Sequence, residues 1–123
     1  MPAYLSPEWF TEADALLRAD ANLSERSRGV DLVLEQRVGD GDSKVIWHVH
    51  FDDGVVSMTR GPAQSPDVIF VSYAETAEGI RSGALSAQAA FIAGDLRIEG
   101  SISALLEHAE LFASLNDVLG PLR

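Results

Sequence analysis

Cysteine is absent from this sequence, which excludes disulfide bonds, cysteine nucleophiles and thiolate metal sites. The sequence also lacks any apolar run near the roughly 18 residues that a helix needs to cross a bilayer, and no signal peptide is recognisable at its start. We therefore expect a cytoplasmic protein without stable membrane anchoring.

Basic residues are few: nine lysines and arginines stand against nineteen acidic residues, Lys44 is the only lysine, and the formal net charge is −10. A surface of this charge repels phosphate backbones and anionic lipid head groups. The charge therefore predicts that the protein has no nucleic-acid partner and no electrostatic docking on anionic membranes.

Length and hydrophobic content indicate the domain organisation. With 123 residues, of which 46% are hydrophobic, residues 1–123 are expected to form one globular domain. A chain of this size buries about two-thirds of its extended-chain surface, which is enough for one core.

The start of the sequence predicts a helix. Ser6-Pro7-Glu8 places a capping hydroxyl, a proline and an acid where a helix begins. We predict that this helix covers residues 6–21 and that the polar residues 22–29 form a connection.

Three amphipathic strands are predicted next, in an antiparallel meander. Apolar and polar residues alternate over residues 30–38, 44–51 and 55–59. Turn residues separate them at 39–42 and at Asp52-Asp53-Gly54.

A short apolar strand is predicted at 68–71, and Ser72 with Glu75 resembles the capping box of a following helix. Near the end of the sequence, Ser101 or Ser103 is expected to begin one last helix that Gly120-Pro121 terminates. The apolar face of this last helix is wider than a surface helix requires.

Between these segments, the run Ser82–Gly100 contains the signals of a helix and then of a strand. Gly83 can end an earlier helix, Ser86 can cap the next one, and Gly94 can end it. Leu96–Glu99 then alternates as a strand with one face on the core. The whole pattern predicts an α+β fold: one five-stranded, mainly antiparallel sheet with helices packed on one face.

This region is similar to the signature of the sterol carrier protein 2 family. The matching segments follow one another at matching spacing: Asp67–Phe70, Ser72–Glu75, Gly83, Ala90-Phe91 and Gly94–Gly100. The similarity extends upstream to about Val30 and downstream into the last helix, and it does not include residues 1–28. It implies the same architecture with an apolar tunnel between sheet and helices, which holds fatty acyl chains, acyl-CoA or sterols.

Catalytic and metal-binding patterns are sparse. The sequence has no Gly-x-Ser-x-Gly elbow and no phosphate-binding loop, so we expect a protein that is not an enzyme and that uses no cofactor. His48 and His50 share one side of a strand and could ligate a metal with Glu35, whereas Arg37 would oppose one. A polar outer sheet face is the alternative interpretation of these residues, and we predict no metal.

Large apolar residues exceed what the other patterns explain, and a packed core or a cavity would need the same residues. The resemblance decides between the two and implies that the strands and helices supply the lining of a lipid-binding tunnel. The candidate lining residues are Leu32, Leu34, Trp47, Val49, Phe51, Phe70, Ile80, Phe91, Ile98, Leu105, Leu106 and Phe112.

The expected function is non-catalytic binding and carriage of a lipid or another hydrophobic small molecule, and we expect the last helix to move when the ligand enters. Asp95 stands where the family commonly has a lysine, and Glu99 adds a second acid, so neutral or simple acyl ligands are favoured over acyl-CoA. The alternative is a ligand-free scaffold for self-association, for example as a homodimer, or for a partner enzyme. Trp9 and Phe10 would then supply the interface.

Overall fold

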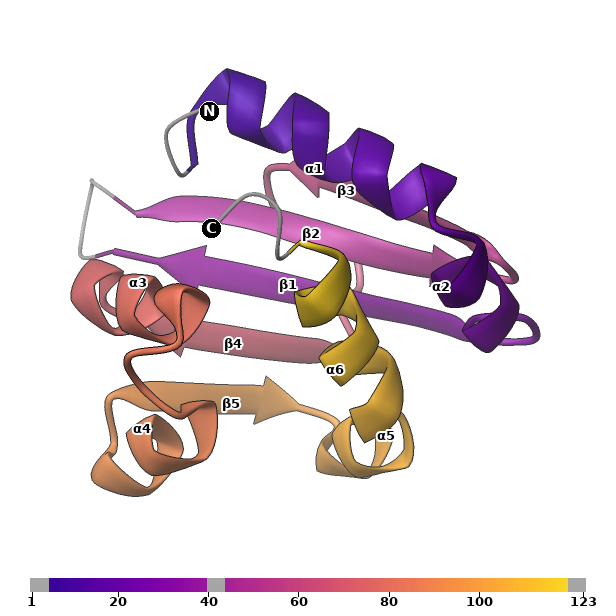
Figure 1. Cartoon of the computed structure of the whole chain (residues 1–123). Helices are drawn as coiled ribbons and strands as arrows, with labels where there is room; N and C mark the ends of the chain where they lie inside the picture. The colour runs from indigo at the N-terminus through magenta and orange to yellow at the C-terminus, as the bar shows by residue number, and fades with distance from the viewer. Residues whose placement is uncertain (1–4, 40–43, 120–123) are drawn as a thin grey trace.

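The computed structural model describes residues 5–39 and 44–119, in which helices and strands are arranged as one sheet with helices against it (Figure 1). In chain order the elements are α1 (Pro7–Ala19), α2 (Ala21–Arg26), β1 (Asp31–Val38), β2 (Val45–Asp52), β3 (Val55–Arg60), β4 (Val68–Ser72), α3 (Ala74–Ser82), α4 (Ala87–Ala93), β5 (Leu96–Gly100), α5 (Ile102–Glu107) and α6 (Ala109–Val118). No described helix is both long enough and apolar enough to cross a membrane.

The five strands form one sheet in the order β3-β2-β1-β4-β5. Neighbouring strands are antiparallel except β1 and β4, which are parallel. The predicted α+β fold with a mainly antiparallel five-stranded sheet is therefore confirmed. The crossover from β3 to β4 carries the chain from the meander to its last two strands and makes β4 parallel to β1.

The two faces of the sheet are covered differently. The helices lie on one face, where Leu34, Val49 and Met58 are aligned across β1, β2 and β3 and are buried (Figure 1). The connection 61–67 passes across the other face. Its backbone N–H groups donate to three places along the way: Gly61 to the Ile46 carbonyl at 2.7 Å, Ala63 to the Glu35 carboxylate at 2.8 Å, and Asp67 to the Val33 carbonyl at 2.9 Å.

The N-terminal helix differs from the prediction at its end. α1 begins as predicted, with the Ser6 hydroxyl accepting from the Trp9 N–H at 3.2 Å, but it stops at Ala19. Asp20 is extended and its carboxylate accepts from the Leu23 N–H at 2.8 Å, which starts α2. The prediction of a polar connection at 22–29 is wrong for its first part, because burial of Leu23 anchors this short helix in the core.

Most local helix signals in the second half are confirmed. Gly83 and Gly94 end α3 and α4 in left-handed conformation, and the Ser86 and Ser101 hydroxyls cap α4 and α5. The predicted capping role of Ser72 is wrong. Ser72 is the last residue of β4, and Tyr73 precedes α3 without a side-chain cap.

The last helical segment is two helices instead of the predicted one. The helix is interrupted at His108, whose φ of −111° and ψ of 25° lie outside the helical region. The break lets α6 turn Leu111 and Leu115 into the core, and it explains why the apolar face was too wide for one helix. The predicted terminator Gly120-Pro121 and the turn residues 40–42 lie outside the described residues.

Candidate functional site

The helix-covered face of the sheet holds the largest set of candidate residues. Five of them are buried to 2% exposure or less within the main hydrophobic cluster: Leu32, Leu34, Trp47, Val49 and Phe51. They come from β1 and β2, where α1 and α6 pack. This half of the face is a filled core.

Phe112 connects this filled half to the other half of the face. Its ring centroid lies 6.2 Å from that of Phe51 on β2 and 6.2 Å from that of Phe70 on β4, with steep interplanar angles in both pairs. Edge-to-face contacts of this kind stabilise aromatic clusters. The structure thus brings together three predicted residues that are far apart in the sequence.

Toward β4 and β5 the same face is less completely covered. Phe70, Ile98, Leu105 and Phe112 pack against the buried cluster but are only half-buried, and Ile80 on α3 is half-buried as well. Apolar side chains that keep part of their surface in water can gain further burial from a ligand. This half-covered part of the face, formed by these five residues, is the candidate binding site.

Two predicted lining residues lie elsewhere. Phe91 on α4 is 49% exposed and Leu106 on α5 is 73% exposed, so neither belongs to the buried cluster. Helical periodicity places both on apolar faces, but it does not show whether another element covers that face. Sequence reasoning also missed four exposed apolar residues in the same region, namely Tyr73, Leu85, Ile92 and Ile102.

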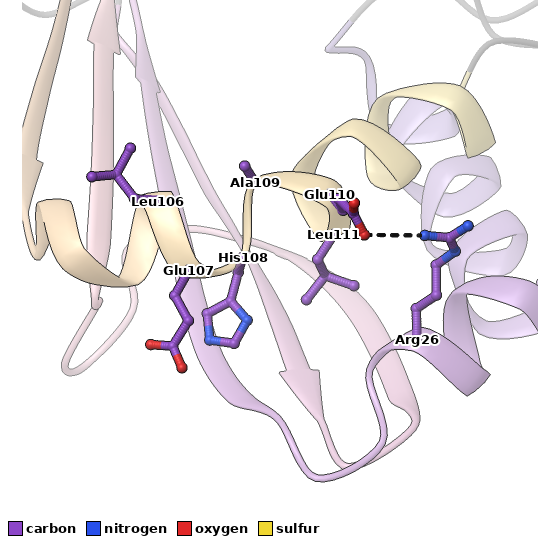
Figure 2. Close-up of a pocket in the computed structure, with 7 residues that line it drawn as sticks. All are labelled: Arg26, Leu106, Glu107, His108, Ala109, Glu110 and Leu111. Atoms are coloured by element: carbon purple, nitrogen blue, oxygen red, sulfur yellow. Dashed lines mark ion pairs between the residues drawn. The ribbon is translucent and has the colours of Figure 1, made fainter.

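A separate surface pocket of about 380 Å³ lies at the junction of α5 and α6 (Figure 2). It is lined by Arg26, Leu106, Glu107, His108, Ala109, Glu110 and Leu111. Arg26 Nη1 lies 3.9 Å from Glu110 Oε2, which joins α2 to the start of α6 (Figure 2). The lining mixes four polar or charged residues with three apolar ones, so this pocket suits a hydrocarbon chain less well than the candidate binding site does.

Arginine side chains near the candidate binding site are paired with acids. Arg81 Nε donates to Glu78 at 3.0 Å, and this hydrogen bond holds the pKa of the Glu78 carboxyl below its ordinary value. Arg97 Nη2 lies 3.5 Å from Glu99 Oε2. An anionic head group would therefore compete with Glu78 for the Arg81 guanidinium, whereas Arg97 and Glu99 lie on the opposite face of the sheet from Ile98.

The two strand histidines lie on the opposite face of the sheet and have different partners. His48 Nδ1 is 2.9 Å from the Gly61 carbonyl oxygen, and His50 Nε2 is 2.9 Å from Asp31 Oδ1. Glu35 lies opposite His48 in the register, but its carboxylate binds Arg37 and the Ala63 N–H. The described residues contain no group of three or more side chains placed to hold a metal ion.

The aromatic residues assigned to an alternative interface are part of the core. Trp9 and Phe10 are 3% and 7% exposed, and their rings pack edge-to-face on Trp47. The prediction that they form an interaction surface is wrong, because α1 turns both rings toward the sheet.

Comparison with known proteins agrees with this architecture. The sequence profile of the SCP-2 sterol transfer family matches residues 13–113. The chain belongs to this family. The match begins inside α1 and so extends further upstream than the resemblance seen in the sequence.

Solved structures share the fold at low sequence identity. A crystal structure of sterol carrier protein 2 aligns with a TM-score of 0.76 and 18% identity, over 96% of this chain and 98% of that one. Sterol carrier protein domain 2 of Helicoverpa armigera aligns with a TM-score of 0.62 and 22% identity, over 98% and 96%. The palmitated SCP2L2 protein of Aedes aegypti aligns with a TM-score of 0.61 and 23% identity, over 94% and 95%. Comparison with curated protein sequences gave no significant match.

Proposed function

We propose that this protein binds and carries a hydrophobic ligand with a neutral or simple acyl character, without a chemical step of its own. The observation that supports this function is the half-covered apolar face formed by Phe70, Ile98, Leu105, Phe112 and Ile80. A hydrocarbon chain lying between β4–β5 and α5 would complete the burial of these side chains.

The energetics of chain burial are sufficient for binding. Each methylene group removed from water contributes up to about 0.8 kcal/mol, so eight of them supply roughly 6 kcal/mol before ordering costs. Membership of the SCP-2 sterol transfer family and likeness to a palmitated relative support this class of ligand.

The acidic surroundings favour a ligand without a phosphorylated head group. Arg81 and Arg97 are engaged with Glu78 and Glu99, and the net charge of the chain is −10. A coenzyme A group would meet repulsion from these carboxylates. We therefore expect palmitate or an uncharged long-chain lipid to bind more tightly than palmitoyl-CoA.

Calorimetric titration of the delipidated protein with palmitate tests the proposal. Ala104 precedes Leu105 of the candidate binding site on α5 and is half-buried against the core, so we expect Ala104→Phe to occupy space beside Leu105 and to weaken palmitate binding at least tenfold. Ala113→Phe, at an exposed position on α6, is the matched control and should bind like the wild type. Failure of the wild type to bind palmitate or any uncharged lipid would leave only a ligand-free scaffold.

A further inference from the structure

The strand β5 forms an outer edge of the sheet. It pairs with β4 on one side, and no described strand lies on its other side (Figure 1). Its outer-face residues Arg97 and Glu99 are exposed. An unpaired strand edge presents backbone donors and acceptors that can pair with another chain.

The hydrogen bonds between β4 and β5 show which backbone groups of β5 point away from the sheet. The Ser101 N–H donates to the Asp67 carbonyl at 2.7 Å, toward β4. In an antiparallel strand every second residue points its backbone N–H and C=O to the same neighbouring strand. The backbone groups of Arg97 and Glu99 therefore point to β4, like the N–H of Ser101. Ile98 lies between them, and its N–H and C=O therefore point to the open edge.

The opposite edge of the sheet is protected in a way that β5 is not. On β3, the Met58 N–H donates to the Asp14 carboxylate of α1 at 2.8 Å, and the Ser24 hydroxyl donates to the Gly54 carbonyl at 2.7 Å. Helices α1 and α2 thus occupy backbone groups at and beside the β3 edge. Among the described residues no side chain hydrogen bond of this kind covers β5.

We propose that two copies of this chain associate by antiparallel pairing of their β5 strands about a two-fold axis at Ile98. In this register Ile98 faces Ile98 of the second copy, and the two residues exchange backbone hydrogen bonds. Arg97 of each copy then lies opposite Glu99 of the other, in the non-hydrogen-bonded pair where side chains are closest. The two sheets join into one, with the helices of both copies on the same face.

Charge selects this register over its neighbours. Sliding the second strand by two residues in one direction would place Arg97 opposite Arg97, and sliding it the other way would place Glu99 opposite Glu99. Like charges directly opposite one another destabilise a strand pair. The edge of β5 is therefore self-complementary only when the axis passes through Ile98.

The helices that flank β5 add apolar surface to the same interface. α4 precedes the strand and α5 follows it, so a two-fold axis brings α4 of one copy next to α5 of the other (Figure 1). Both present exposed apolar side chains: Phe91 and Ile92 on α4 are 49% and 77% exposed, and Ile102 and Leu106 on α5 are 47% and 73% exposed. Residues 82–94 carry no charge, so this surface loses little solvation when it is covered.

A charge-exchange experiment by sedimentation velocity tests the register. Arg97→Glu makes positions 97 and 99 both acidic, and Glu99→Arg makes both basic, so each variant alone should dissociate at least tenfold more readily than the wild type. An equimolar mixture of the two should form heterodimers, since the two acids of one variant then face the two arginines of the other. Neither variant retains an intrachain 97–99 ion pair, so recovery in the mixture reports only the contact between copies.

Variants at exposed positions away from β5 serve as controls. Arg28→Glu, an equal charge change at an exposed position remote from β5, should associate like the wild type. Ile92→Ser should weaken association at least tenfold, whereas Val55→Ser, which alters an exposed apolar residue on the β3 edge, should not.

A wild type that stays monomeric at high micromolar concentration, or a mixture that stays monomeric, would overturn the proposal. Binding of such a monomer to phosphatidylcholine vesicles would assign the apolar residues of α4 and α5 to a lipid surface instead. Failure of palmitate binding would not affect this test, because the strand pairing uses the backbone of Ile98 at the open edge and not its side chain at the candidate binding site.

Discussion

Glu35 shows how a single residue fastens a connecting segment to one face of this sheet. Its side chain is 1% exposed on the face opposite the helices, and its two oxygens accept from the Ala63 N–H at 2.8 Å and from Arg37 Nε at 2.7 Å. The carboxylate thus fastens the connection 61–67 to β1. A buried acid is tolerated here because both of its oxygens have donors.

Removing this carboxylate should destabilise the fold. Glu35→Ala leaves the Ala63 N–H and the Arg37 guanidinium without their acceptor, so we expect the free energy of unfolding to fall by about 1–3 kcal/mol in urea titrations. Glu35→Gln keeps an acceptor oxygen and should cost less. The control Glu12→Ala, at an exposed position on α1, should change stability by less than about 0.5 kcal/mol. Equal effects of Glu35→Ala and Glu12→Ala would contradict this role.

At the scale of elements, two features require a glycine at the end of β5: a left-handed backbone conformation and close packing against β4. Gly100 has a φ of +92°, and a Cβ atom there would clash with the Asp67 carbonyl oxygen. Gly94, which ends α4 with a φ of +85°, has open space around it. A substitution at Gly94 therefore changes only the energy of the backbone conformation, whereas a substitution at Gly100 also introduces a steric clash.

This difference predicts unequal effects of the same substitution. Gly94→Ala should cost about 1–2 kcal/mol, the penalty of a left-handed conformation for a residue with a Cβ. Gly100→Ala adds a clash with backbone that no side-chain rotation relieves, so it should cost clearly more. Chemical unfolding at a low protein concentration, where the chain is monomeric, measures both. Similar losses for the two variants would show that the β4–β5 approach relaxes easily.

Element boundaries also show what local signals can and cannot predict. The caps at Ser6 and Ser86 and the left-handed Gly94 involve hydrogen bonds within a few residues, and the sequence predicted all three. The break at His108 has no comparable local signal. It arises because α6 packs against α2, a contact between segments about ninety residues apart in the chain.

For the molecule as a whole, burial decreases from the α1 side of the sheet to the β5 side. The β1–β2 half of the face is filled, whereas α5 contributes no buried residue and α4 carries exposed Phe91 and Ile92. α6 differs from α5, because its Leu111 and Leu115 are each only 5% exposed. The prediction that the last helix moves when the ligand enters stays a prediction, and we now expect the movement of α5 alone, because Leu111 and Leu115 anchor α6 in the core.

Hydrogen exchange measured along the chain tests this gradient. Amides of α5 should exchange fastest among the helices that follow α1, and amides of β1, β2 and α6 should be the most protected, because local opening is cheapest where few apolar contacts are lost. Addition of palmitate should slow exchange in α5 more than in α1. Equal protection of α5 and α6 would show that they open as one unit.

Local signals are sufficient to predict the α+β fold and the family: these are the alternation of the strands, most of the helix caps and the segments between Asp67 and Gly100. Of the twelve predicted lining residues, five are buried within the core cluster, and Phe91 and Leu106 are exposed. Local patterns show which face of an element is apolar, but not what covers it.

Which apolar residues are buried, half-buried or exposed depends on how the helices pack on the sheet. Leu34 and Phe70 look alike in the sequence, yet Leu34 is 1% exposed within the core cluster while Phe70 is only half-buried against it. The physical reason is that burial depends on contacts between residues distant in the chain. The same reason explains Glu35: its donors, in particular the Ala63 N–H, reach it only because the connection 61–67 crosses the sheet.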